Sequence, residues 1–243
     1  MKLQYVSDIH LEHRSLIPRI EPVSDQAYLA LCGDIGNPFL ANYEEFLSIH
    51  SQLYKRILVI AGNHEYFHHT IPETHNQIHT LIKKYENVTY LNQESIIIGR
   101  TKFLGCTLWS DTSIIRDEAQ SFMNDYKKIF LQKDQLLKPA HTTELHHQMK
   151  EWLRQELNHN GDIIILTHHP ATFGMLPMLD KYSPCYGSES DELIRKPVKY
   201  WISGHTHACL TYMVDDVTCV SNCMGYPGRE SLDFQTDKYV IFN

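Results

Sequence analysis

The chain has 243 residues and a formal net charge of −7 with neutral histidines. This acidic balance argues against bulk attraction to nucleic acid or to an anionic membrane. The hydrophobic fraction of 42% and the charged fraction of 21% are ordinary for a globular protein with a sizeable core. Since no apolar run approaches the roughly 18 residues of a membrane span, and the first residues do not form a signal peptide, we expect a cytoplasmic protein.

Short apolar runs, often β-branched and followed by turn residues, predict buried strands along the whole chain. In chain order they are Leu3 to Val6, Tyr28 to Cys32, Ile57 to Ala61, Ile96 to Ile98, Lys102 to Leu108, Ile163 to Leu166, Tyr200 to Ile202, Ala208 to Val214, Val217 to Val220 and Tyr239 to Phe242. Apolar residues at helical spacing predict helices at Leu40 to Tyr54, Thr74 to Tyr85, Asp117 to Phe130 and Thr142 to Leu157. The alternation of strand and helix in the first third favours an α/β fold, and the closely spaced later strands indicate a mixed sheet.

The chain shows no internal repeat, low-complexity segment or Gly/Ser-rich linker, so we predict one domain over residues 1–243. Residues 110–139 carry the weakest strand signal and are interpreted as an insertion or a cap. The six cysteines form no C-x-x-C pair. We therefore expect reduced, mostly buried thiols.

Metal-competent side chains follow five of the predicted strands. In an extended segment, residues two apart face the same side, so Asp8 with His10, and His205 with His207, can each converge on one ion. The other three groups are Gly33-Asp34, Gly62-Asn63-His64-Glu65 and Thr167-His168-His169-Pro170. Each group alone is a weak signal. Together they are specific, because open α/β sheets place ligand sites outside the carboxyl ends of their strands.

The donor types indicate transition-metal ions. Mixed imidazole and carboxylate ligands suit Zn, Mn, Fe or similar metals without any thiolate. Seven donors are too many for one such ion, but they fit two ions that share one carboxylate. The seven are Asp8, His10, Asp34, Asn63, His168, His205 and His207.

Taken in order, the motifs D-x-H, G-D, G-N-H-E, T-H-H-P and G-H-T-H resemble the five motifs of the calcineurin-like metallophosphoesterase superfamily, over Asp8 to His207. The resemblance implies a four-layer sandwich of two mixed β-sheets packed face to face with helices outside. It also implies two divalent or trivalent ions, Mn, Fe or Zn, with Asp34 as the bridging ligand. One ion would be held by Asp8, His10 and His207, and the other by Asn63, His168 and His205.

The activity implied by the resemblance is hydrolysis of a small phosphorylated substrate. The two ions would activate a bridging hydroxide for in-line attack on phosphorus, and His64 would act as general acid or transition-state stabiliser. In Thr167 to Pro170 the family pattern makes the first histidine the ligand, which leaves His169 outside the ligand set. The substrate, the choice between phosphomonoester and phosphodiester, and the oligomeric state stay open.

Four alternatives compete with this interpretation. A purely structural metalloprotein is disfavoured, because an asparagine ligand with an unassigned neighbouring histidine makes little sense for a closed structural site. A catalytically silent scaffold with the same fold is disfavoured, because such members usually have degraded ligands or lack the catalytic histidine. A nuclease usually needs a basic groove or extra domains, which the acidic balance and length do not supply. A protein phosphatase is disfavoured because Gly33 to Pro38 reads G-D-I-G-N-P and lacks the arginine of that branch's G-D-x-x-D-R-G motif.

Some residues beside the motifs have no firm role in the sequence. His68 and His69 follow the third motif and could line a substrate pocket or lie in a solvated loop. Arg14 could contact a phosphate oxygen. Tyr226, in the glycine-bounded segment 225–228, is interpreted as part of a plain turn, with Arg229 beside it.

Overall fold

The computed structural model describes residues 1–243, and its first β-sheet contains the N-terminal strands. This five-stranded sheet has the order β13-β1-β2-β3-β4. Four neighbouring strands are parallel, and β13 runs antiparallel to β1. The strands are β1 (Lys2–Val6), β2 (Tyr28–Cys32), β3 (Arg56–Ile60), β4 (Val88–Tyr90) and β13 (Tyr239–Ile241).

The second sheet has six strands in the order β11-β12-β10-β9-β6-β5. Its four central strands are parallel, and the edge strands β5 and β11 are antiparallel to their neighbours. The strands are β5 (Glu94–Ile98), β6 (Thr101–Cys106), β9 (Ile163–Thr167), β10 (Val198–Ser203), β11 (Thr211–Val214) and β12 (Val217–Ser221). A separate small hairpin joins β7 (Phe130–Gln132) to β8 (Gln135–Leu136).

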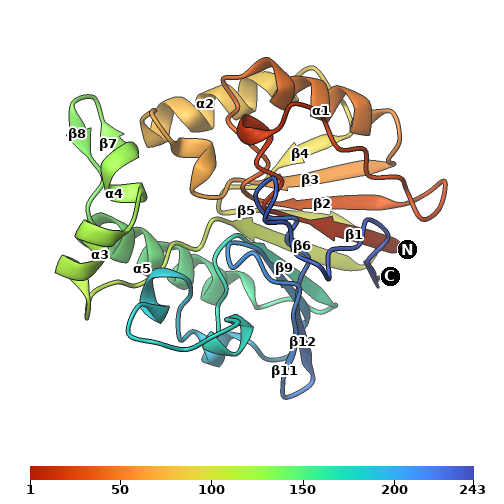
Figure 1. The fold of residues 1–243 in the computed structure, drawn as a ribbon. Helices are drawn as coiled ribbons and strands as arrows, with labels where there is room; N and C mark the ends of the chain where they lie inside the picture. The colour runs from red at the N-terminus through yellow and green to blue at the C-terminus, as the bar shows by residue number, and fades with distance from the viewer.

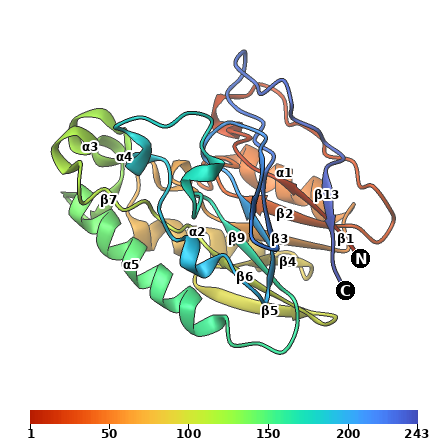
Figure 2. The ribbon, with the colours of Figure 1, turned by 90° about the horizontal axis from the view of Figure 1, so that it is seen from below.

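Helices cover the outer face of each sheet. In Figure 1, α1 (Ala41–Ser51) and α2 (Ile71–Ile82) lie over the first sheet, and α5 (Pro139–Glu156) lies under the second. The short helices α3 (Arg116–Phe122) and α4 (Asp125–Lys128) stand with β7 and β8 at the end of the molecule away from the two termini, in both views (Figures 1 and 2). Single 3-10 turns occupy Leu11–His13, His64–Tyr66, Phe173–Met175, Ser183–Cys185 and Asp191–Leu193. The predicted α/β sandwich of two mixed sheets flanked by helices is confirmed.

The strand residues alternate between two cores because successive side chains of a strand point to opposite faces. Leu3, Ile164 and Leu166 belong to the 15-residue cluster that fills the space between the sheets. Val59 and Ile165 face the other way, into a 45-residue cluster that also contains buried side chains of α1, α2 and α5. Since both faces of the central strands are buried, the strands read as continuous apolar runs in the sequence.

The segment 110–139 differs most from its sequence-based expectation. One helix was predicted over Asp117 to Phe130, but α3 ends at Phe122, and Met123 adopts an extended conformation with φ −75° and ψ 137°. The break lets Met123 and Asp125 both line the central pocket, and this tertiary placement overrides the helical spacing. The strands β4, β7 and β8 were not predicted because they contain only three, three and two residues.

All six thiols are free, and five of them are buried, as predicted. None of the helices is both long enough and apolar enough to cross a lipid bilayer.

Candidate metal centre

The five motif loops leave the carboxyl ends of β1, β2, β3, β9 and β10 and meet at one rim of the two sheets. Five of the predicted ligands in these loops have a left-handed backbone, which non-glycine residues rarely adopt. They are Asp8 (φ 54°), His10 (φ 53°), Asp34 (φ 52°), His205 (φ 69°) and His207 (φ 51°). Strain of this kind persists only where surrounding contacts enforce it, and it clusters at functional sites.

Glu65 fixes the second and third motif loops to each other. Its carboxylate is fully buried and accepts the backbone N–H groups of Gly62 at 2.7 Å, Ile35 at 2.8 Å and Asp34 at 2.9 Å. Burial and the Asp34 carboxylate raise the pKa of Glu65 to about 8, while His168 and the backbone donors oppose the rise. Glu65, the last residue of G-N-H-E, therefore holds the ligand loops together and is not itself a metal ligand.

Two glycines allow these loops to approach each other closely. A Cβ atom on Gly62 would lie 2.3 Å from Oδ1 of Asp34, and one on Gly33 would lie 2.4 Å from Nδ1 of His168. Gly33 also has φ +83°, which a side chain would strain. Both motif glycines are thus required by space, and Gly33 by its backbone geometry as well.

The first donor group contains Asp8, His10 and His207, whose ligand atoms lie within 4.8 Å of one another. The Nε2 atoms of His10 and His207 are 3.0 Å apart, and Nε2 of His207 lies 3.4 Å from Oδ1 of Asp8. Nδ1 of His10 faces Oε1 of Glu12 at 3.2 Å, so this nitrogen carries the ring proton. The neutral ring then presents the lone pair of Nε2 to the other two donors.

The second donor group contains Asn63, His168 and His205. Nδ1 of His168 donates to the carbonyl oxygen of Cys32 at 2.9 Å, and this bond turns Nε2 of the ring toward the other donors. Nε2 lies 3.1 Å from Oδ1 of Asn63 and 3.2 Å from Nδ1 of His205. Oδ1 of Asn63 is itself an acceptor, because its Nδ2 donates to Asp125 at 2.8 Å.

Asp34 lies between the two groups. Its Oδ2 atom is 3.4 Å from Nε2 of His168 and 4.0 Å from Nε2 of His10. Burial opposes ionisation of Asp34, but His168 and His64 hold its pKa well below the ordinary value. Although burial alone would lower it, the neighbouring Asp34 raises the pKa of His168 to about 10. Donor atoms that converge in this way need a positive charge among them, which without a metal is the proton on His168 and which bound metal ions would supply in its place.

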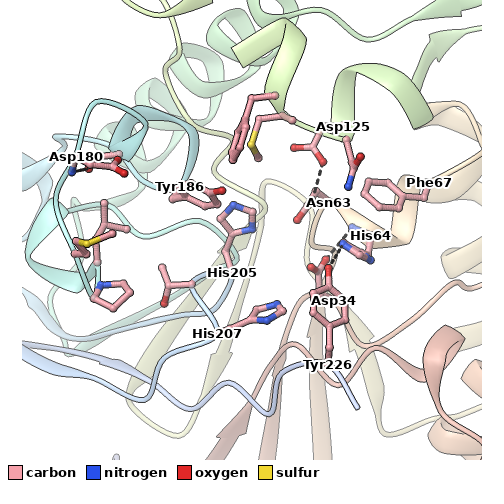
Figure 3. Close-up of a pocket in the computed structure, with 18 residues that line it drawn as sticks. Asp34, Asn63, His64, Phe67, Asp125, Asp180, Tyr186, His205, His207 and Tyr226 are labelled. Carbon is pink, nitrogen blue, oxygen red and sulfur yellow. Dashed lines mark hydrogen bonds between the residues drawn. The ribbon is translucent and has the colours of Figure 1, made fainter. Parts of the chain in front are cut away.

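His64 stands beside the first group with both ring nitrogens engaged. Nδ1 donates to Oε1 of Glu12 at 2.9 Å, and Nε2 lies 3.0 Å from the hydroxyl of Tyr226. Burial opposes the charged ring, but Asp34 and Glu12 together raise the pKa of His64 above its usual value. The Tyr226 ring also stacks on His10 with centroids 4.2 Å apart. Figure 3 shows His64 and Tyr226 next to Asp34.

A cavity of about 630 Å³ opens over the donor groups. Asn63, His64 and Asp34 lie on one side of it in Figure 3, with Asp180 and Tyr186 on the other. His68 and His69, left open in the sequence, do not line it. The ring of His69 instead stacks on Phe39 at 3.6 Å.

Arg14 does not face the donors either. Its guanidinium donates to the backbone oxygens of Ile9 and Gly225 and to Glu230. These bonds hold the segment of Tyr226 against the first motif loop. His169 lies in contact with the second donor group, its ring 4.1 Å from that of His205, and burial lowers its pKa to about 3.

The sequence as a whole matches a model of the calcineurin-like phosphoesterase family over residues 1–209. The chain belongs to this family. All seven converging donors lie within the matched part of this phosphoesterase, whereas Tyr226 lies beyond it. Membership in the family, together with the clustered donors, makes the chain a metal-dependent hydrolase of phosphate esters.

Known relatives span nearly the whole phosphoesterase chain. The uncharacterized protein L509 of Acanthamoeba polyphaga mimivirus is 28% identical over 269 residues, which covers 98% of this chain and 95% of that protein. The phosphopantetheinyl hydrolase PptH of Mycobacterium tuberculosis has a similar fold, with 16% identity, a TM-score of 0.73, and coverage of 93% of this chain and 90% of that chain. A dimetal phosphatase from Danio rerio is similar at 11% identity and a TM-score of 0.54, with coverage of 90% and 86%.

Three residues at the phosphoesterase site were not singled out in the sequence for the contacts that they make. Asp125 was predicted as part of a helix and Tyr226 as part of a turn, and Glu12 was given no role. Glu12 lies in the 3-10 turn Leu11–His13 that follows the left-handed His10, so the alternation of an extended chain could not have identified it. Nothing local marks Asp125 or Tyr226, because their partners Asn63 and His64 are 62 and 162 residues away.

Proposed function

We propose that this phosphoesterase works with two metal ions. Asp8, His10 and His207 hold one ion, and Asp34 bridges it to the second. The second ion is held by Asn63, His168 and His205. The observation that carries the proposal is geometric: the ligand atoms of Asp8, His10 and His207, and those of Asp34, His168 and His205, lie within 4.8 Å of one another in each group. Oδ2 of Asp34 is close to both groups, 4.0 Å from Nε2 of His10 and 3.4 Å from Nε2 of His168.

When bound, a pair of such ions supplies an activated water for attack on phosphorus and neutralises charge on the phosphate oxygens. The metals are Mn, Fe or Zn, to which imidazole and carboxylate donors are suited. The chain contributes the rigid placement of the donors, since Glu65 and the two motif glycines leave the loops little freedom.

His64 acts as the general acid in this proposal. Glu12 accepts the proton of Nδ1, which orients the ring and stabilises its charged form. Burial opposes ionisation of Glu12, but the hydrogen bonds from His10 and His64 lower its pKa to about 2, so it stays a carboxylate. Nε2 of His64 is then the atom that gives a proton to the departing oxygen.

Tyr226 occupies that side of His64. Burial raises the pKa of its phenol, so the hydroxyl stays neutral, and its oxygen can accept the proton of Nε2 in a hydrogen bond. We assign Tyr226 the role of holding Nε2 of His64 at the edge of the cavity. The substrate is a small phosphorylated molecule, and the cytoplasmic location stays a prediction from the sequence.

The proposal is tested by assay of the Mn²⁺-loaded protein with p-nitrophenyl phosphate and bis-p-nitrophenyl phosphate. We expect metal-dependent hydrolysis that disappears in Asp34→Asn together with bound metal. Asp215→Asn, an exposed carboxylate in the turn between β11 and β12, is the matched control and should keep both. A folded, metal-loaded protein that hydrolyses neither compound would instead support a silent scaffold.

A further inference from the structure

The cavity over the donor groups is far larger than a phosphate group requires. Its volume of about 630 Å³ lies within the range of sites that enclose whole organic ligands, roughly 300–1,000 Å³. The proposed ligands and His64 form only part of its lining, with His205 and His207 lying between His64 and the side of Tyr186 and Asp180 (Figure 3). The remaining walls must therefore contact the organic part of a substrate.

These walls come from two segments outside the metal-binding loops, and each segment contributes large apolar or aromatic side chains beside polar ones such as Asp125 and Asp180. Phe122 and Met123 come from the end of α3, and Leu176, Met178 and Tyr186 come from the segment between β9 and β10. Such side chains give affinity by removing apolar surface from water, so they fit an apolar ligand group.

Two of the apolar side chains in these walls, Phe122 and Met178, expose much of their surface to water. Phe122 is 50% exposed and Met178 is 71% exposed, although both are large and apolar. Phe122 stacks on Tyr182 at 4.8 Å, which links α3 to the segment 173–186 across the rim of the cavity. Exposed apolar side chains gathered beside a polar site indicate a binding surface.

The charged residues that line the cavity limit the charge that a ligand can carry. None of its 18 lining residues is Lys or Arg, whereas three are aspartates: Asp34, Asp125 and Asp180. Asp180 lies on the wall opposite His64 (Figure 3). A second phosphate or a carboxylate on the substrate would meet no cation there and would be repelled by Asp180. A single phosphate of low charge, as in a diester, suits this environment better.

We propose that the site takes phosphodiesters with one phosphate and an uncharged, largely apolar organic group, which binds between α3 and the segment 173–186. This proposal rests on the proposed function, since it assumes that the phosphate lies at the donor groups. In it, Phe122 and Met178 determine substrate specificity, and residues 110–139 form a cap over the organic group.

Binding of alkyl methylphosphonates to the Mn²⁺-loaded protein, measured by calorimetry, tests the proposal directly. The ethyl, butyl and hexyl esters carry the same single charge and differ only in apolar length. A fully buried methylene strengthens binding about fourfold, and walls that are half exposed should give about twofold for each. From ethyl to hexyl we expect the dissociation constant to fall about 16-fold, whereas a 5-carboxypentyl ester should bind no better than the ethyl ester.

The variants Phe122→Ser and Met178→Ser should each flatten this dependence on chain length. Both side chains are at least half exposed, so the fold does not depend on them. Ile97→Ser, at a 61% exposed position on the edge strand β5, removes a comparable side chain far from the cavity and should keep the full dependence. Equal affinity for all three esters in the unchanged protein overturns the proposal, as does an unchanged dependence in both cavity variants.

Hydrolysis of methyl and hexyl p-nitrophenyl phosphate separates this proposal from the proposed function. Hydrolysis of both at equal rates, with equal affinity for the esters, refutes the apolar subsite and leaves the phosphoesterase intact. Length-dependent binding without any hydrolysis refutes the catalytic proposal and leaves the subsite intact.

Discussion

Replacement of Asp125 by Leu should weaken metal binding, although we do not assign Asp125 as a ligand. Its Oδ1 accepts Nδ2 of Asn63 at 2.8 Å, and this bond turns Oδ1 of Asn63 toward His168. Asp125 and Asn63 are only 5% and 4% exposed, so water replaces the bond poorly. In Asp125→Leu the buried Nδ2 loses its acceptor at a cost of about 1–3 kcal/mol. A flip of the amide relieves that cost but turns the NH₂ group toward the metal position.

Loss of an outer contact to a metal ligand typically lowers metal affinity or activity about 10–100-fold. We expect that loss for Asp125→Leu, measured as the Mn²⁺ dissociation constant by calorimetry and as kcat/KM. Asp125→Asn keeps an acceptor oxygen without the charge, so its loss should be clearly smaller. The thermal midpoint of both variants controls for unfolding. A folded Asp125→Leu protein with unchanged metal affinity and kcat/KM would refute the assigned role.

Three further predictions concern His64, Tyr226 and His146. His64→Ala should keep its metal and lose turnover about 10²–10⁴-fold, measured as kcat beside metal content; unchanged kcat would remove the general-acid assignment. Tyr226→Phe loses one hydrogen bond to His64 and should lower kcat about fivefold, whereas an effect on the thermal midpoint alone would show a purely structural role. Burial lowers the pKa of His146 to about 4, whereas in the unfolded chain this side chain has a pKa near 6.5. The unfolded state therefore takes up the proton first, and the free energy of unfolding falls by about 3 kcal/mol as the pH drops from 7 to 4. In His146→Gln, denaturant titrations should show a shallower loss over that range, and an identical pH dependence would contradict the burial argument.

The ligand loops were predictable because their signals are local. Each metal-competent group follows directly on an apolar run, and Asp8 and His10 meet as predicted. The predicted pairing of His205 with His207 was wrong: His207 joins Asp8 and His10, whereas His205 joins Asp34 and His168, because His205 and His207 have left-handed rather than extended backbone. The buried strands also read clearly, and β2 begins and ends where the sequence predicts, at Tyr28 and Cys32. Parallel strands then bring their carboxyl ends to one rim without further information.

The cavity walls were not predictable, because tertiary contacts decide them. The helical spacing of apolar residues continues through Met123, but the helix ends at Phe122. This end of the helix places Asp125 against Asn63. Likewise, nothing in the sequence around Tyr226 indicates that its hydroxyl reaches His64. Local propensity carries no information about partners so far apart along the chain.

The central claim is that the seven donors hold a pair of metal ions, with Asp34 between them. Anomalous scattering from crystals of the Mn²⁺-loaded protein locates each ion individually. We expect two peaks, both in contact with Asp34, one among Asp8, His10 and His207 and the other among Asn63, His168 and His205. A single peak at full occupancy, or peaks elsewhere with the donor groups left empty, would contradict the claim.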